Sequence, residues 1–359
     1  MLIPFRLLRS LCAARAFRCV AALVLALSAS GIFAPAPAAA QEKTCRIAYL
    51  EAGPFWLYAK TLAAFKAALN GPQGCRILYP EDLHVSLGWR GSPQDLEGQA
   101  RRLFAAGPDL ILAAGTDAVR ALLAVNDGRT PILGLALADP LAAGFMKAPA
   151  QSVAPNFTCE VVPDRWKNMY RVFHDVIGFK KLGVMYPAGP TGKVYGGVDD
   201  ALAVAQEASF SVLEAVIPDE SAAACRKGIE DLHQRGADAF FIGPLNCFDW
   251  SSADPTPLLD LLISYGMPTF ARDGSIFVQG GALMGFSTWD FSPTGRRLAQ
   301  AAMRILSGTP PAQVHLTGTS EPLIALNLET ARKLGFNLPF DVLVVADEIY
   351  ATTSKPDLR

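Results

Sequence analysis

Short runs that are apolar at every position alternate with longer segments of helical period along most of this 359-residue chain. The stretch 108–125, P-D-L-I-L-A-A-G-T-D-A-V-R-A-L-L-A-V, shows one such unit: an apolar run ends at a glycine and leads into a helix. A strand that is apolar throughout must be covered on both faces, and the intervening helices supply that cover. The pattern therefore predicts an α/β fold built on parallel sheets.

The predicted strands share the short, apolar composition of buried parallel strands. They cover residues 47–50, 77–79, 110–114, 132–136, 182–186, 212–217, 239–242 and 282–286. Apolar stripes predict helices over 56–69 and 258–263, and a long helix from about Pro163. The first two of these helices lie between successive strands, which is the arrangement that parallel crossovers require.

A weak internal repeat indicates two lobes of related topology. The segments G-P-D-L-I-L-A-A-G-T-D (107–117) and T-P-I-L-G-L-A-L-A-D-P (130–140) are echoed by G-A-D-A-F-F-I-G-P-L-N (236–246) and M-P-T-F-A-R-D-G (267–274). In both copies an Asp precedes an apolar strand that ends at a Gly, and a Pro then opens the next strand. The chain is predicted to pass from the first lobe to the second near 156–161.

The first forty residues differ from the rest and predict a cleaved secretory signal over 1–40. Its basic residues come first: Arg6, Arg9, Arg15 and Arg18. An apolar run over 20–27 and the small-residue tail A-P-A-P-A-A-A-Q follow, which favours cleavage between Ala40 and Gln41. The alternative is a retained membrane anchor, but the run is shorter than the ~20 residues of a membrane span. We expect a soluble, exported protein in the periplasm.

Charge argues against binding to nucleic acid or to an anionic membrane surface. The whole chain has a formal net charge of −1, and the signal segment contains arginines but no acidic residue. The processed chain is therefore more acidic than the full chain. Nucleic acid and anionic lipid attract the opposite charge.

Five cysteines remain after processing: Cys45, Cys75, Cys159, Cys225 and Cys247. The strand starts C-R-I-A-Y-L and C-R-I-L-Y-P are alike, so adjacent parallel strands in register would bring Cys45 close enough to Cys75 for a disulfide. A bridge between Cys225 and Cys247 is the weaker second candidate, and the odd number leaves at least one thiol free. No Cys-x-x-Cys occurs and the four histidines are scattered, so no metal is expected.

Motifs for catalysis or for a cofactor are missing. No predicted strand is followed by G-x-G-x-x-G, and the string G-P-T-G-K-V at 189–194 lacks the first glycine and the final Ser/Thr of a phosphate-binding loop. G-x-S-x-G is also absent. His84, in the loop E-D-L-H-V-S, is a lone candidate base and is more typical of a solvated surface residue. We expect no catalytic residue, no cofactor and no enzymatic activity.

The loops after the predicted strands favour a ligand-binding cleft. Open α/β sheets bind ligands beyond the carboxyl ends of their strands, where helix N-termini present free N–H groups. Gly115, Thr116 and Asp117 occupy such a place, although Thr116 or Asp117 could serve only as a helix cap. The loop that ends at Tyr195 is expected to be the first cleft loop of the second lobe.

Further candidates follow other predicted strands. They are Glu51, Phe55, Trp56, Asp139, Asn246, Trp250, Asp273 and Trp289. Aromatic faces together with carboxylates and amides suit a small amphiphilic ligand that carries an amine or other donors. Each aromatic residue alone could instead pack against its own lobe, so their recurrence at strand ends carries the prediction.

Several of these segments resemble a known family. The runs D-L-I-L-A-A-G-T-D-A-V, T-P-I-L-G-L-A-L-A-D-P-L-A-A-G-F and N-F-T resemble ABC-transporter substrate-binding proteins, whose characterised members bind tryptophan or tyrosine. The segments G-G-A-L-M-G-F-S, S-P-T-G-R-R-L-A-Q-A-A-M-R-I-L-S-G-T-P-P-A and N-L-E-T-A-R-K-L-G-F-N-L-P-F-D-V-L-V-V-A-D-E-I-Y extend the likeness over the processed chain.

The resemblance implies a type I periplasmic binding-protein fold with two Rossmann-like lobes joined by a three-strand hinge. The N-terminal lobe would hold 41–157 plus 287–315, and the C-terminal lobe 158–286 plus 316–359. By matching position, Thr116, Asp139, Asn246 and Asp273 fall in ligand-facing loops. The chain departs from the family at L-N-C-F-D-W, at Cys159 in place of a glycine, and in the glycine-rich loop before Tyr195. These departures bear on the identity of the ligand and leave the expected fold unchanged.

We therefore expect the periplasmic solute-binding component of an ABC importer. The expected ligand is a small organic molecule, with aromatic or other amino acids as the candidates that the resemblance implies. The expected partner is a membrane permease, and the protein is expected to be a monomer. Two alternatives stay open: a ligand-sensing module for a receptor kinase and, less favoured, an exported hydrolase that depends on His84.

Overall fold

The computed structural model describes residues 43–71, 75–189, 191–286, 290–318 and 323–357. From Thr44 onward the chain forms one compact unit that contains two large β-sheets. The expected signal segment 1–40 lies outside the described residues. In the described part of the chain, no helix has both the length and the apolar composition needed to cross a membrane.

The first sheet has the strand order β14-β8-β5-β4-β1-β2, and β3 pairs with β1. Its strands are β1 (Lys43–Glu51), β2 (Cys75–Leu78), β3 (His84–Ser86), β4 (Leu110–Ala114), β5 (Ile132–Leu135), β8 (Phe157–Val161) and β14 (Leu316–Thr317). The pairings of β1 with β3 and β4, of β4 with β5, and of β8 with β5 and β14 are parallel. The parallel α/β fold predicted from the sequence is thereby confirmed for this sheet.

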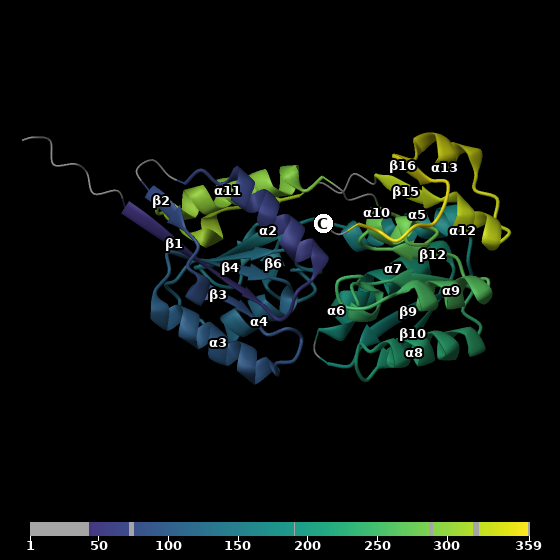
Figure 1. The fold of residues 1–359 in the computed structure, drawn as a ribbon, viewed down its shortest axis with the longest axis horizontal. Helices are drawn as coiled ribbons and strands as arrows, with labels where there is room; N and C mark the ends of the chain where they lie inside the picture. Colours follow the sequence, from purple (N-terminus) through teal and green to yellow (C-terminus); the bar gives the residue numbers. More distant parts are fainter. Residues whose placement is uncertain (1–42, 72–74, 190, 287–289, 319–322, 358–359) are drawn as a thin grey trace, which may run out of the picture. The chain divides into compact units, whose positions relative to one another are not determined.

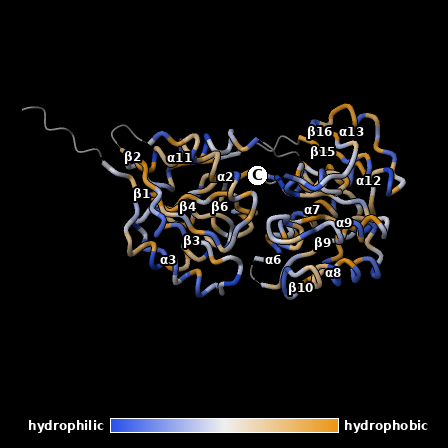
Figure 2. The backbone as a smooth tube through the Cα atoms, viewed as in Figure 1, coloured by the Kyte–Doolittle hydropathy of each residue, from blue (hydrophilic) through white to orange (hydrophobic). Residues whose placement is uncertain are grey.

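Side chains of successive residues in a strand point to opposite faces, and the helices cover both faces of this sheet. Ile47 and Tyr49 of β1 belong to the core of α2 (Trp56–Ala68) and α11 (Ser292–Leu306), while Leu50 belongs to the core of α3 (Pro93–Ala106) and α4 (Thr116–Ala124). Figure 1 shows these two helix pairs on opposite sides of the sheet. In Figure 2, apolar stretches follow β1 while polar stretches lie on α3. This double cover explains why the central strands β4 and β5 are apolar and buried at every position.

The second sheet has the order β10-β9-β11-β12-β13-β15-β16. Its strands are β9 (Lys181–Pro187), β10 (Ser211–Ile217), β11 (Ala239–Ile242), β12 (Thr269–Ala271), β13 (Met284–Phe286), β15 (Ile324–Asn327) and β16 (Glu348–Tyr350). All pairings are parallel except that of β13 with β15. The main helices of this part are α5 (Arg165–Ile177), α7 (Val198–Ala208), α8 (Ala222–Gln234) and α9 (Thr256–Ser264).

The shorter elements cap or extend these sheets. They are the hairpin β6 (Met146–Ala148) and β7 (Gln151–Ser152), and the helices α6 (Gly192–Gly196), α10 (Ser275–Gln279), α12 (Leu328–Lys333) and α13 (Phe340–Val345). Three single turns of 3₁₀ helix add to them: η1 (Glu81–Leu83), η2 (Asn246–Phe248) and η3 (Pro311–Gln313). Of these, α6 and η2 follow strands of the second sheet and carry residues of the site described below.

The chain passes between the two sheets three times: after β8, after β13 and after β14. β15 is the first strand after the third passage and runs antiparallel to β13. The predicted lobe boundary at 157 falls at the start of β8, which runs to Val161, and the one at 315 falls just before β14 (Leu316–Thr317). Both strands pair within the first sheet. We therefore propose a first lobe that extends through Val161 and through β14.

Each disulfide lies within one lobe: the first joins two strands of the first sheet, and the second joins a helix and a 3₁₀ turn that follow strands of the second sheet. Cys45 of β1 is bonded to Cys75 of the neighbouring β2, with 6.0 Å between the Cα atoms. Cys225 of α8 is bonded to Cys247 of η2, with 6.6 Å between the Cα atoms. Cys159 of β8 is a buried free thiol. Its burial, helped by the neighbouring Glu160, raises the pKa of the thiol and keeps it protonated.

Candidate ligand-binding site

A cavity lies where loops from the two sheets meet, and we call it the aromatic cavity. Its volume is about 510 Å³, including its open mouth. From the first-sheet side it is lined by Phe55, Tyr58, Trp89, Asp117, Ala136 and Ala138. From the second-sheet side it is lined by Tyr195, Glu220, Pro244, Asn246 and Arg272. All these residues follow the carboxyl ends of parallel strands, the edge where open α/β sheets bind ligands.

The turn after β4 makes room for one wall of this cavity. Gly115 has φ of 81°, a left-handed conformation that favours glycine. A Cβ atom at Gly115 would lie 2.1 Å from the hydroxyl oxygen of Tyr58. The glycine thus allows the Tyr58 ring to pack against the start of α4, where Asp117 occupies the first turn. The glycine turn in 108–125 therefore forms one wall of a cavity.

Trp89 stands out among the lining residues because its backbone is strained. It has φ of 63°, a conformation that costs a residue other than glycine of order 1–3 kcal/mol. Its backbone N–H donates to the Ala52 carbonyl at 3.1 Å and its indole Nε1–H donates to the Pro54 carbonyl at 2.8 Å. A Cβ at Gly53 would lie 2.4 Å from the indole ring. The loop after β1 therefore fixes the indole at the edge of the cavity.

Hydrogen bonds join the two sides of the site. The Tyr195 hydroxyl donates to the Asp117 carboxylate at 2.9 Å. The Trp166 indole N–H donates to the Ala138 carbonyl at 3.1 Å, and the Arg272 guanidinium donates to the Leu137 carbonyl at 3.4 Å. Each of these bonds connects the second-lobe side to a helix start or loop that follows a strand of the first sheet, so the contacts depend on how closely the two sides approach.

The cavity contains one cation, which is already paired. Arg272 and Asp273 are each 3% exposed, and an Arg272 nitrogen lies 2.9 Å from an Asp273 oxygen. The guanidinium also lies over the Trp166 ring, 5.3 Å from its centroid. A buried charge that loses its partner is strongly destabilising. Asp273 therefore neutralises and orients Arg272.

Two carboxylates, Asp117 and Glu220, also line the cavity. Burial, with a smaller contribution from Asp117, raises the pKa of Glu220 to about 6. The Asn246 backbone N–H donates to Glu220 at 2.6 Å and offsets part of that rise. Burial and the Asp117 charge raise the pKa values of the Tyr58 and Tyr195 hydroxyls, which stay protonated.

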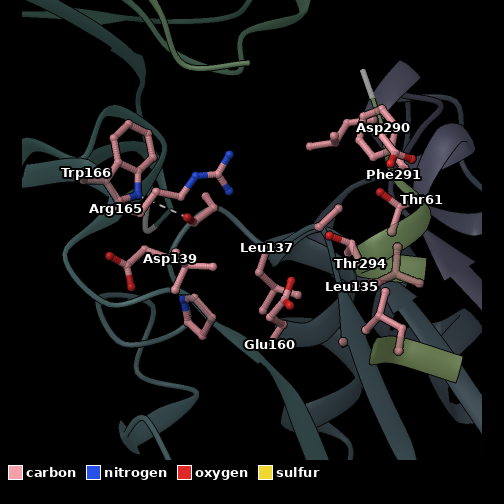
Figure 3. Close-up of a pocket in the computed structure, with 17 residues that line it drawn as sticks. Thr61, Leu135, Leu137, Asp139, Glu160, Arg165, Trp166, Asp290, Phe291 and Thr294 are labelled. Atoms are coloured by element: carbon pink, nitrogen blue, oxygen red, sulfur yellow. Dashed lines mark hydrogen bonds between the residues drawn. The ribbon is translucent and has the colours of Figure 1, made fainter. Parts of the chain in front are cut away.

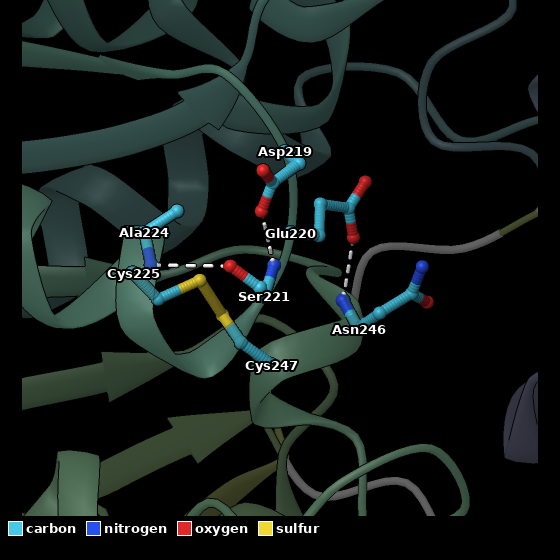
Figure 4. Close-up of a disulfide and its surroundings, with 7 residues drawn as sticks. All are labelled: Asp219, Glu220, Ser221, Ala224, Cys225, Asn246 and Cys247. Carbon is cyan, nitrogen blue, oxygen red and sulfur yellow. Dashed lines mark hydrogen bonds between the residues drawn. A yellow bond between two sulfur atoms is a disulfide. The ribbon is translucent and has the colours of Figure 1, made fainter.

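The second disulfide holds the loops that carry Glu220 and Asn246 (Figure 4). Glu220 precedes Ser221, whose Oγ caps α8 by accepting from the Ala224 N–H at 3.2 Å. Cys225 lies in the first turns of α8, and its partner Cys247 directly follows Asn246. The disulfide and the hydrogen bond from Asn246 to Glu220 thus link the same two loops.

A second cavity lies beside the first and shares Ala136 and Ala138 with it. We call it the crossover cavity, because Glu160, Arg165 and Asp290 lie near passages between the sheets. Its volume is about 840 Å³, including open solvent. Figure 3 shows the Arg165 guanidinium extending into it. Burial, and to a lesser extent Arg272, lowers the pKa of Arg165 to about 10, so Arg165 remains positively charged at neutral pH.

The structure brings four of the predicted site residues together: Phe55, Asp117, Tyr195 and Asn246 all line the aromatic cavity. Gly115 lies against the Tyr58 hydroxyl and, having no Cβ, leaves room for it. Thr116 is buried, and its Oγ accepts from the Ala138 N–H at 3.3 Å. Thr116 thereby ties the start of α4 to the loop after β5.

The other predicted residues lie elsewhere. Asp139 lines the crossover cavity and caps its own loop by accepting from the Leu141 N–H at 2.8 Å. Glu51 and Trp56 line a separate pocket. Trp250 packs against the ring of Phe277. Trp289 lies outside the described residues.

Several residues of the aromatic cavity were not predicted from the sequence: Tyr58, Trp89, Ala136, Ala138, Glu220, Pro244 and Arg272. Glu220 follows the predicted strand 212–217 and could have been found by the rule that selected Asn246. Tyr58 lies one turn after Phe55 on α2. Trp89 gave no periodic signal, because it follows a three-residue strand that was not predicted.

The described residues offer little for catalysis or metal binding. Within them, no group of three or more His, Cys, Asp or Glu side chains is placed to hold a metal ion. His84 is exposed and its ring stacks on Tyr49, with 4.6 Å between the centroids. Neither the aromatic cavity nor the crossover cavity includes His84.

Two lobes with parallel sheets, three passages between them and a ligand-sized cavity at the strand ends define a two-lobed binding protein of the type I periplasmic fold. The profile of the family described as "ABC transporter substrate binding protein" matches residues 86–350, and the chain belongs to that family. Its members are non-enzymatic binding proteins. The family resemblance predicted from the sequence is confirmed.

Solved structures support the fold. A conserved domain protein from Vibrio cholerae has a TM-score of 0.68 and 18% identity, over 86% of this chain and 99% of that chain. The ABC domain from Streptococcus pneumonia in complex with L-Trp has a TM-score of 0.67 and 17% identity, over 86% and 100%. CD0873 from Clostridium difficile, solved ligand-free and open, has a TM-score of 0.58 and 21% identity, over 86% and 100%. No curated protein sequence matches the chain.

Proposed function

We propose that this chain is the periplasmic solute-binding component of an ABC importer and captures a small organic ligand in the aromatic cavity. The observation that carries the proposal is that loops from both sheets line one ligand-sized cavity and contact each other there. A ligand that contacts both sides favours the closed arrangement by its difference in affinity for the two states. A separate permease would then receive the ligand from the closed form.

The proposed site consists of residues that line the aromatic cavity and present aromatic faces, carboxylates and an amide: Phe55, Tyr58, Trp89, Asp117, Tyr195, Glu220 and Asn246. Such a lining suits a ligand that combines an apolar body with an amine. The L-Trp complex of the pneumococcal structure makes amino acids one class to test. Cleavage after Ala40 and a monomeric state belong to the same proposal.

A thermal-shift screen of the chain from Gln41 tests this function. Amino acids, amines, small carboxylates, nucleosides and sugars are compared as ligands, after unfolding, dialysis and refolding to remove any bound molecule. A ligand at 100 times its dissociation constant that binds only the folded state adds about 2.7 kcal/mol to the free energy of unfolding. We expect a selective rise of several degrees with one class. A flat result across all classes would contradict the proposal.

A further inference from the structure

The carboxylates of the aromatic cavity have no cationic partner among the described residues. No lysine or arginine nitrogen in the described chain lies within 4.0 Å of the Asp117 or Glu220 carboxylate, whereas Arg272 is paired with Asp273. Asp117 accepts from the Tyr195 hydroxyl and Glu220 accepts from the Asn246 N–H, and both of these donors are neutral. The lining therefore has an excess of negative charge whenever Glu220 is ionised.

An independent observation concerns Tyr58. Its side chain lines the cavity and the residue is only 7% exposed, and its hydroxyl is not among the fully buried polar atoms that lack a partner, so the hydroxyl is open to the cavity. A hydroxyl that faces the cavity can accept a hydrogen bond from a ligand N–H group. The Phe55 ring packs edge-on against the Tyr58 ring at 5.3 Å, and the Trp89 indole lines the same space. Aromatic faces of this kind attract organic cations.

We propose that the aromatic cavity selects an organic ammonium ion that carries no carboxylate beside its amine. The ammonium group binds between Asp117 and Glu220 and donates to the Tyr58 hydroxyl, and its apolar body packs against Phe55 and Trp89. This inference rests on the proposed function and specifies its substrate class. It distinguishes a simple amine from the corresponding amino acid.

The charges around the ammonium position explain why the proposed ligand carries no carboxylate beside its amine. The carboxylate of an α-amino acid is attached to the carbon that carries the amine, so it would lie close to the same two protein carboxylates. Asp117 already supplies negative charge at the N-terminus of α4, which reduces the attraction of that helix end for an anion. Arg272 is the cation in the lining of this cavity and is ion-paired with Asp273, whereas Arg165 lines the neighbouring crossover cavity.

Matched pairs of ligands test the inference, since each amine differs from its amino acid by one carboxylate. Tyramine and tyrosine, tryptamine and tryptophan, and cadaverine and lysine are titrated calorimetrically into the refolded chain from Gln41 at pH 7.5. We expect at least one amine to bind, and to bind at least tenfold more tightly than its amino acid. Equal or tighter binding of the amino acids overturns the inference but leaves the proposed function standing. Failure of all three amines to bind also overturns it, while the wider screen decides the function separately.

Variants locate the ammonium group. Glu220→Gln and Tyr58→Phe are expected to weaken binding of the best amine at least tenfold and threefold, respectively. Glu207→Gln is the matched control, because Glu207 pairs with Arg171 on the surface and lies outside the cavity. Circular dichroism and the melting temperature confirm that each variant is folded. Unchanged affinity in both cavity variants would overturn the inference, as would a Glu207→Gln loss of the same size.

Discussion

Glu220 is the residue whose protonation governs the charge of the aromatic cavity near neutral pH. Its pKa is raised to about 6, and it faces Asp117 from α4, Tyr195 from α6 and the Asn246 N–H from η2. A raised carboxyl pKa means that the folded chain holds this proton more tightly than the unfolded chain does. The contribution of Glu220 to stability is therefore fully present below its ordinary pKa of 4.5 and is lost as the pH rises through 6.

Binding of a cation should have the opposite pH dependence. We expect the affinity for the best amine to fall about tenfold between pH 7.5 and pH 5, because protonation removes one of the two charges that attract the ammonium group. Calorimetric titration across this range measures the effect. Glu220→Gln should bind weakly with little change over the same range, and a wild-type profile that stays flat would contradict the assigned role.

At the scale of single residues, the site residues that the sequence identified correctly all follow a predicted apolar strand. Asn246 and Asp117 follow apolar strands that were predicted correctly, and both line the cavity. Trp89 and Arg272 follow β3 and β12, three-residue strands too short to show a period. The pairing of Arg272 with Asp273 could not be predicted either, because adjacent acidic and basic residues are common on surfaces. The structure shows instead that both are buried.

Among the structural elements, the two disulfides provide a matched comparison. Their loops span 30 residues for Cys45–Cys75 and 22 residues for Cys225–Cys247. Loops of these lengths predict similar stabilisation, about 3 kcal/mol each. Only the second bond holds loops that line the aromatic cavity, through Glu220 and Asn246. Their effects on stability should therefore be similar and their effects on binding different.

We expect the double variant Cys225→Ala, Cys247→Ala to lose both stability and ligand affinity. The control, Cys45→Ala with Cys75→Ala, should lose a similar free energy of unfolding and keep its affinity. Urea denaturation measures the free energy, and calorimetric titration at a temperature where both variants are folded measures the dissociation constant. An equal change of affinity in the two variants would show that the second disulfide does not position the site.

For the whole molecule, three of the hydrogen bonds described above connect the two sides of the aromatic cavity. The bond from Tyr195 to Asp117 is one of them, and a hydrogen bond to a charged group contributes about 1.5 kcal/mol or more net. Tyr195→Phe should therefore shift the unliganded equilibrium at least about tenfold toward the open form. Fluorescence energy transfer between one label on each lobe measures this shift. Tyr186→Phe is the control, because the Tyr186 hydroxyl bonds to Glu214 within the second sheet; an equal shift in the control would contradict the role of Tyr195.

The overall fold could be predicted largely from the sequence, because double-sided burial makes parallel strands recognisable. The strands β1, β4, β9 and β11 all contain a predicted apolar run. The lobe boundaries were harder to place, because β8 and β14 pair within the first sheet at points where the chain is about to leave it. β14 has only two residues, and its place depends on pairing with β8, which lies far away in sequence.

The positions of the cysteines along the chain bear on oxidative folding. Each native pair joins two cysteines that are consecutive in the sequence, and the free Cys159 stands between the two pairs. An oxidant that joined thiols in the order of their emergence from a membrane channel would make Cys45–Cys75 correctly and would then join Cys159 to Cys225. Thiol exchange can correct that error only while Cys159 is still accessible. Correct maturation therefore requires either that β8 encloses Cys159 before Cys225 is exposed to the oxidant, or that Cys159 stays accessible until exchange has corrected the pairing.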